Sequence, residues 1–311
     1  MIIAIIVVTL ILLTYFCISY AFFDFVCGKA KFLKLSIDEN PNNEKLNEFK
    51  KRTQLGIAWS SSHQFEQISI KSRDGLNLFA RLFLNGDNKK IMLFFHGYRS
   101  AAEQDFGGAV DFYYSLGYTI VFADQRSCGK SEGKYTTYGI KERYDCLEWV
   151  NYLTARFKND AQIILCGVSM GASTVLMASS LKLPQTVKGI IADCGYSSPK
   201  EIIETVAKKS IKIPTPLIWF FLSPMAHIFG GFGFDEASPE REVSKTKLPI
   251  LFVHGKSDTF VPTYMSEKNY NSCKSKKILL LTEDADHVQS YLKNESDYKK
   301  NVIEFLKYTK G

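Results

Sequence analysis

The chain has 311 residues, of which 46% are hydrophobic and 23% are charged, and its formal net charge is +7 at pH 7. These values are typical of a globular protein large enough for one α/β domain with an appendage. The basic residues are scattered and no arginine-rich stretch is interleaved with aromatic residues, so we expect no nucleic-acid partner. The seven cysteines include no Cys-x-x-Cys pair, which argues against a zinc site and against a disulfide framework.

The first 23 residues contain no charged side chain and are rich in Ile, Val, Leu and Phe. As a helix they would be roughly 34 Å long, enough to cross the hydrocarbon core of a bilayer. A cleaved signal peptide is the alternative, but the segment lacks a basic start and its apolar run is too long. We therefore expect a transmembrane anchor over residues 1–28. Lys29, Lys31 and Lys34 follow it, so the positive-inside rule puts the large domain in the cytoplasm.

Residues 29–62 are polar and predict a tether or a peripheral helix. Beyond them, apolar or alternating runs predict eight strands, at residues 65–72, 76–84, 91–95, 118–123, 163–166, 187–192, 249–253 and 278–282. The first two strands meet at Asp74-Gly75, a hairpin signal. The later runs are continuously apolar, as in parallel strands that are buried on both faces.

Helical patterns alternate with these strands, at residues 104–116, 140–156, 172–183, 265–273 and 298–308. This alternation predicts a mostly parallel α/β sheet with helices on both faces and an antiparallel hairpin at its start, over residues 63–311. Residues of about 195–247 interrupt the alternation with an apolar, aromatic insertion. We interpret this insertion as a lid over the carboxyl ends of the strands.

The sequence Gly167-Val168-Ser169-Met170-Gly171 lies between a predicted strand and a predicted helix. Glycines two residues before and after a serine allow a sharp turn that exposes the hydroxyl group, as in a nucleophile elbow. The helix N-terminus would then direct free N–H groups at the bond under attack. Ser169 is therefore the candidate nucleophile, with Gly167 and Gly171 forming the elbow.

A serine nucleophile needs a base and an orienting carboxylate. In α/β sheets with a nucleophile elbow, the catalytic residues follow the chain order Ser, Asp, His, so the base should lie after the last strand. His287 follows the last predicted strand and is the candidate base. Asp258, after the preceding strand, is the candidate acid, and Asp193 is its rival. The backbone N–H groups of Met170 and Tyr98 are the candidate oxyanion donors.

Five ordered motifs resemble the α/β-hydrolase superfamily, in particular membrane-anchored bacterial serine hydrolases of the serine aminopeptidase S33 and BEM46-like group. They are Phe95-His96-Gly97-Tyr98, residues 124–133, residues 167–171, residues 249–262 with Asp258, and Asp286-His287. The resemblance implies the α/β-hydrolase fold and hydrolysis of a carboxylic ester or peptide-type acyl bond without a cofactor. The acidic residues near the C-terminus are not spaced as metal ligands.

These observations predict a membrane-tethered serine hydrolase that works through an acyl-enzyme intermediate. The apolar insertion and the anchor suggest a small-molecule or lipid-like acyl ester as substrate. Three alternatives remain open: an acyltransferase or thioesterase, an aminopeptidase that holds the substrate ammonium group with Asp235 or Glu236, and a catalytically idle membrane scaffold. Arg99 is interpreted as a solvated side chain.

Overall fold

The structure is a computed structural model, and it describes residues 1–29, 44–86, 89–158, 160–210 and 212–309. Within these residues, eight strands form a single sheet. The strands are β1 (Glu66–Lys71), β2 (Asn77–Phe83), β3 (Lys90–Phe95), β4 (Thr119–Ala123), β5 (Gln162–Val168), β6 (Val187–Asp193), β7 (Ile250–Gly255) and β8 (Lys277–Thr282). Their order in the sheet is β1-β2-β4-β3-β5-β6-β7-β8. The strands β3 to β8 are parallel to one another, whereas β2 is antiparallel to both β1 and β4.

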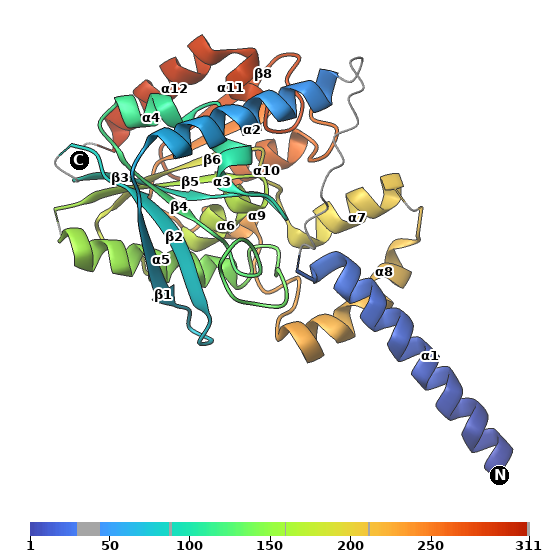
Figure 1. The fold of residues 1–311 in the computed structure, drawn as a ribbon. Coiled ribbons are helices and arrows are strands. Elements are labelled where there is room, and N and C mark those ends of the chain that lie inside the picture. The colour runs from blue at the N-terminus through green and yellow to red at the C-terminus, as the bar shows by residue number, and fades with distance from the viewer. Residues whose placement is uncertain (30–43, 87–88, 159, 211, 310–311) are drawn as a thin grey trace.

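Helices cover both faces of the sheet (Figure 1). They are α1 (Ile2–Cys27), α2 (Glu44–Ser62), α3 (Ala102–Phe106), α4 (Val110–Ser115), α5 (Glu142–Phe157), α6 (Met170–Ala178), α7 (Pro199–Ser210), α8 (Thr215–Met225), a π-helical turn η1 (Ala226–Gly230), α9 (Pro239–Val243), α10 (Tyr264–Ser272), α11 (Ser290–Lys293) and α12 (Glu295–Tyr308). The core on one face joins the sheet to α5 and α6, and the core on the other face joins it to α2, α4 and α12.

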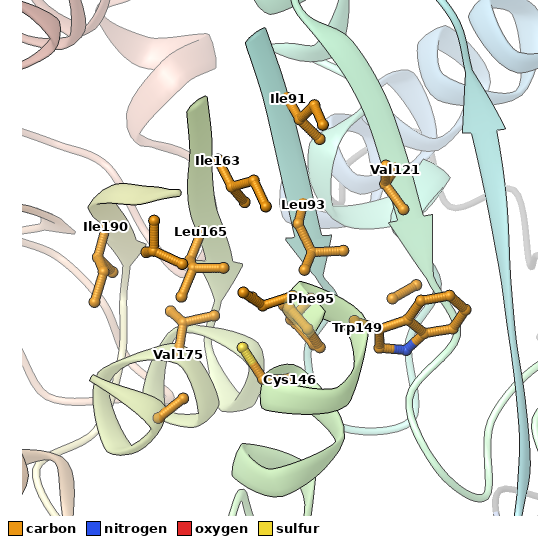
Figure 2. Packing of buried hydrophobic residues seen from close by; sticks show 14 of the residues in the cluster. Ile91, Leu93, Phe95, Val121, Cys146, Trp149, Ile163, Leu165, Val175 and Ile190 are labelled. Atoms are coloured by element: carbon orange, nitrogen blue, oxygen red, sulfur yellow. The ribbon is translucent and has the colours of Figure 1, made fainter. Parts of the chain in front are cut away.

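The side chains of β3 show why both faces are covered. Successive residues of a strand point to opposite faces, and in β3 nearly all of them are apolar. Ile91, Leu93 and Phe95 pack towards Trp149 of α5 (Figure 2), while Met92 and Phe94 belong to the opposite core. Such a strand would expose apolar side chains to water unless both of its faces were buried. The predicted mostly parallel sheet with an antiparallel hairpin at its start is confirmed.

The predicted helix over residues 104–116 is in fact two short helices, α3 and α4, separated by Gly107, Gly108 and Ala109. The helix α2 approaches the chain closely at this break. A Cβ atom at Gly107 would collide with the carbonyl of Arg52, and one at Gly56 would collide with the carbonyl of Glu103. Glycine at these two positions allows the backbones of α2 and α3 to touch.

Residues 44–62, expected as part of a polar tether, form the helix α2 and contact the core of the α/β domain. Trp59 of α2 is buried against Phe83 and Phe122, and Arg52 is also buried. The rest of the expected tether, residues 30–43, lies outside the described residues. The insertion predicted at about 195–247 contains α7, α8, η1 and α9, and residue 211 within it is likewise not described.

The helix α1 extends away from the domain, with the N-terminus at its far end (Figure 1). Among the described residues it is the one helix that is long and apolar enough to cross a membrane. Beside it lie α8 and η1. Tyr15 of α1 donates a hydrogen bond to the Phe220 carbonyl (2.8 Å), and the rings of Tyr20 and Phe229 are 4.9 Å apart.

Candidate active site

Ser169 occupies a sharp turn between β5, which ends at Val168, and α6, which begins at Met170. Its backbone angles are φ 54° and ψ −117°, a conformation that is strained for any residue with a side chain. A Cβ atom at Gly167 would collide with the Gly171 carbonyl, and one at Gly171 would collide with the Phe95 carbonyl. The two glycines therefore let α6 pass close to the sheet, and the turn raises the Ser169 hydroxyl above the carboxyl ends of the strands.

The structure brings Ser169, His287 and Asp258 together, although the residues are far apart in the chain. His287 Nε2 lies 3.0 Å from Ser169 Oγ, and His287 Nδ1 lies 2.7 Å from Asp258 Oδ2. Ser169 follows β5, Asp258 follows β7 and His287 follows β8, so parallel strands deliver all three to one edge of the sheet.

Asp258 is buried and accepts hydrogen bonds on both carboxylate oxygens. The backbone N–H groups of Phe260 and Val261 donate to Oδ1 (2.8 Å each), while His254 Nε2 approaches Oδ2 at 3.1 Å. Burial alone would raise the pKa of Asp258, but its hydrogen bonds with His254 and His287 outweigh that effect and hold the pKa well below its usual range. An ionised carboxylate only accepts hydrogen bonds, so His287 Nδ1 carries the proton. His287 Nε2 is then free to accept the proton of Ser169.

Asp193, the rival acid, does not contact the His287 ring through a hydrogen bond. It ends β6 and is buried, and its Oδ1 has no hydrogen-bond partner among the described residues. Burial raises its pKa to about 6, an effect that the nearby His254 and His287 reduce. Its backbone carbonyl accepts a hydrogen bond from the Ser169 N–H (2.8 Å), so Asp193 supports the turn at Ser169.

The two backbone groups expected to bind an oxyanion are available. Within the described ranges, neither the Met170 N–H nor the Tyr98 N–H donates a hydrogen bond. Both residues line a cavity together with Ser169. The loop that carries Tyr98 is held by Asp105, whose Oδ2 accepts from the Gly97 N–H (2.6 Å), and His96 Nε2 accepts from the Gln125 N–H (3.1 Å).

Two cavities meet at Ser169. The first, of about 300 Å³, is mostly apolar and is bounded by α1, α7 and the loop that follows β7. The second, of about 350 Å³, is more polar and includes His287, Arg52 of α2 and Gln289. Phe260 lines both cavities, and its ring centroid lies 5.2 Å from that of His287. Ser169 therefore borders both a strongly apolar compartment and a more polar one.

Among the described residues, the group that comes nearest to a metal site is Cys194, Asp258 and His287, which present one donor atom each within 4.8 Å. Burial raises the pKa of the Cys194 thiol well above its ordinary value, so the thiol stays protonated and is a poor metal ligand. The oxygens of Asp258 already accept hydrogen bonds. This group is therefore part of the arrangement around Ser169.

Sequence reasoning did not find three contributors to the site. The end of α1 lines the apolar cavity, Arg52 lines the polar one, and His254 is a second partner of Asp258. Of these three, only His254 has a signal in the sequence, because it lies at the end of a strand and four residues before Asp258. Arg99 is also not simply solvated: its Nη2 donates to the Phe25 and Gly28 carbonyls at 2.9 Å each.

Comparison with known proteins agrees with this architecture. A sequence model of the alpha/beta hydrolase fold matches residues 90–215. The uncharacterised protein YqkD of Bacillus subtilis is 32% identical over 195 residues, which cover 61% of this chain and 63% of YqkD. Protein bem46 of Schizosaccharomyces pombe is 25% identical over 219 residues, which cover 69% of this chain and 67% of bem46. The matched region thus spans about six tenths of YqkD.

A solved structure of an esterase from Pyrococcus furiosus superposes on the chain with a TM-score of 0.65 and 26% sequence identity. The superposition covers 81% of this chain and 95% of the esterase. By the topology of its sheet and by its similarity to these proteins, the chain has the α/β-hydrolase fold.

Proposed function

We propose that the protein is a serine hydrolase that cleaves a carboxylic ester through an acyl-enzyme intermediate. The observation that carries the proposal is the continuous set of contacts from Ser169 Oγ to His287 Nε2 and from His287 Nδ1 to Asp258 Oδ2. Nucleophile, base and orienting acid in this geometry are the requirements for acyl transfer through serine. The esterase activity named for the Pyrococcus furiosus relative is consistent with this chemistry.

In the proposed reaction, Ser169 Oγ attacks the ester carbonyl carbon while its proton passes to His287 Nε2. The carbonyl oxygen becomes an oxyanion that accepts hydrogen bonds from the Tyr98 and Met170 N–H groups. When the tetrahedral intermediate collapses, the bond to the alcohol breaks and His287 returns its proton to that alcohol. A water molecule then repeats both steps on the acyl-enzyme, which releases the carboxylic acid and restores Ser169.

The two cavities suggest how an ester would bind. Apolar surface is stabilised by apolar surroundings, so the apolar cavity suits the acyl chain and the polar cavity suits the alcohol portion. An aminopeptidase would need a carboxylate near the ammonium group of its substrate. Among the described residues that line the two cavities, Asp235 and Glu236 do not occur. The Asp235 side chain is 71% exposed and pairs with Lys200. Two carboxylates, Asp105 and Asp286, do line the second cavity, but they already accept hydrogen bonds from backbone N–H groups, so an uncharged acyl ester is the better substrate.

The domain organisation belongs to the same proposal. Residues 1–28 serve as a membrane anchor, and the hydrolase domain with its inserted lid lies on the cytoplasmic side of the membrane. This assignment is supported by the length and composition of α1 and by the lysines that follow it in the sequence.

An activity-based probe tests the proposed chemistry directly. The full chain, purified in detergent, is treated with a fluorophosphonate and is assayed with p-nitrophenyl esters of increasing acyl length. We expect Ser169 to be labelled and Ser169→Ala to lower kcat/KM roughly 10⁴-fold or more, because the triad acts as a unit.

The matched control is Ser180→Ala, which replaces a half-buried serine just beyond α6 and is expected to leave both readouts unchanged. A folded wild-type chain that is not labelled at Ser169 would show that the protein is not a serine hydrolase. Strict preference for acetyl esters over all longer ones would contradict the apolar acyl site.

A further inference from the structure

The C-terminal end of α1 is bonded to the loop that carries Tyr98. Tyr98 Oη donates to the Val26 carbonyl (2.7 Å), and Arg99 Nη2 donates to the Phe25 and Gly28 carbonyls (2.9 Å each). The last carbonyls of a helix have no partner within the helix, and a cation near them is favourable. The loop therefore caps α1, and the two segments are held in one fixed arrangement.

A second attachment holds the same end of α1 against the segment after β4. The Thr136 N–H donates to the Cys27 carbonyl (2.8 Å), and Gly28 forms an isolated β-bridge with Tyr135. The side chains of Phe23 and Cys27 are fully buried, and the ring of Phe23 lies 4.7 Å from that of Tyr135. The final turns of α1 are thus packed and hydrogen-bonded as an element of the folded domain.

On its other side, this end of α1 forms a wall of the apolar cavity at Ser169. Phe22, Phe25 and Val26 line the cavity. The helix α7 supplies apolar lining residues as well, namely Ile202, Ile203, Val206 and Ala207. Since Ser169 and Met170 line the same cavity, an acyl group attached to Ser169 could extend between α1 and α7.

The length of α1 puts this wall near the surface of a membrane. Its 26 residues span about 39 Å, whereas the hydrocarbon core of a bilayer is about 30 Å thick. Roughly six residues therefore extend beyond the core if α1 spans it from its N-terminal end. Those residues are the turns that carry Phe22, Phe25 and Val26. The apolar cavity accordingly lies where a lipid acyl chain enters or leaves the bilayer.

We propose that the end of α1 determines the acyl specificity of the enzyme, by forming one wall of the site that binds the acyl chain of a membrane-resident ester. This inference rests on the proposed function, because it takes Ser169 as the acylated residue. The substrate class is a long-chain acyl ester of low charge, which reaches Ser169 from the bilayer along Phe22, Phe25 and Val26.

Photocrosslinking in the wild-type chain tests the position of the acyl chain. The full chain in liposomes is labelled with an alkyl fluorophosphonate that carries a diazirine at the end of a long alkyl chain, and is then illuminated and digested. We expect mass spectrometry to find crosslinks from the Ser169 adduct to residues 22–26 of α1. Adducts at Ser169 with crosslinks confined to other segments would overturn the inference and leave the proposed function intact.

Chain-length selectivity tests the same wall by mutation. Val26→Trp fills part of the cavity, so we expect the ratio of labelling rates for dodecyl and methyl fluorophosphonates to fall at least tenfold. The matched control is Val8→Trp, the same change on the same helix at a residue that is 54% exposed and far from the cavity, and its ratio should equal that of the wild type. Equal ratios in all three proteins would contradict the role of α1. No labelling of the wild type by either probe would instead contradict the proposed function.

Discussion

The behaviour of His287 is governed by the environment of Asp258. The carboxylate accepts from two backbone N–H groups on Oδ1 and contacts both His254 and His287 through Oδ2. These bonds keep it ionised and fix its orientation, so the His287 ring has one orientation and one tautomer. An amide at position 258 would keep the shape of the side chain but lose its charge.

Asp258→Asn should therefore lower kcat by about ten-thousand-fold, because the amide presents a donor to His287 Nδ1 and favours the wrong tautomer. The measurement is ester turnover by the full chain, with circular dichroism to verify folding. The matched control is Asp193→Asn, which we expect to keep most of the activity. The opposite ranking of the two variants would identify Asp193 as the orienting acid.

Asp193→Asn should also change how stability depends on pH. The pKa of Asp193 is raised to about 6 in the folded protein, against 3.8 ordinarily. Its contribution to stability is therefore fully present below pH 3.8 and is lost as the pH rises through about 6, a change on the order of 3 kcal/mol. The stability of Asp193→Asn relative to the wild type should increase between about pH 4 and 6 and stay constant above. A constant difference in thermal midpoint across this range would contradict the raised pKa.

At the scale of residues, much of the site is predictable from the sequence because each catalytic candidate follows an apolar strand. Ser169, Asp258 and His287 stand in the expected order, and parallel strands bring their ends together. His254 is harder to assign, since its contact with Asp258 depends on how the loop after β7 curls. The part played by Phe22 and Val26 is not predictable, because their partners lie some 70 to 180 residues further along the chain.

Among the elements, α2 differs most from its prediction. Its sequence is polar and shows no helical periodicity of apolar residues. The features that dock it are the buried Trp59, Gly56 of α2 itself and Gly107 at the end of α3. The docking of α2 supports the loop that carries His287, because Arg52 Nη1 donates to the carbonyl of Val288, the next residue (2.6 Å).

Gly56→Ala should lower stability by about 1–3 kcal/mol, because the added Cβ would collide with the backbone of α3. A free tether helix would show the opposite sign, since alanine favours an exposed helix over glycine by about 1 kcal/mol. The measurement is the thermal midpoint, followed by kcat/KM, which should fall as Arg52 is displaced. Leu55→Ala, at a residue that is 44% exposed, is the control and should change neither value. A raised midpoint for Gly56→Ala would show that α2 is not docked.

In the molecule as a whole, α8 and η1 lie beside α1, and all three carry exposed apolar side chains. Residues 215–230 contain no Asp, Glu, Lys or Arg, and four of their large side chains are exposed: Leu217, Phe220, Ile228 and Phe229. An apolar helix of this length, beside a helix that is long and apolar enough to cross a membrane, is typical of an interfacial segment. Fully burying such a side chain contributes roughly 1.5–3 kcal/mol, so we expect α8 and η1 to enter the bilayer beside α1.

Cysteine labelling checks this immersion. In liposomes, Phe220→Cys should react with a membrane-impermeant maleimide at least tenfold more slowly than after detergent is added. Leu55→Cys on α2 is the control for orientation and should react rapidly in both conditions. The native cysteines interfere little, because all but Cys17 are buried and Cys17 lies within α1. Equal rates for the two variants in liposomes would show that α8 lies in water.

The cap that Tyr98 and Arg99 place on α1 has a consequence for how this protein is divided into modules. Membrane anchors are commonly treated as interchangeable targeting segments, which are deleted for crystallography or exchanged in chimeras. In the proposed arrangement, a foreign helix would direct the domain to the same membrane but would bring its own side chains to the proposed acyl site and its own carbonyls to Arg99. Deletion of residues 1–28 would remove Phe23 and Cys27 from the core and open the cavity beside Ser169. Under the proposed function, we therefore expect the truncated and chimeric proteins to differ from the full chain in the esters that they accept.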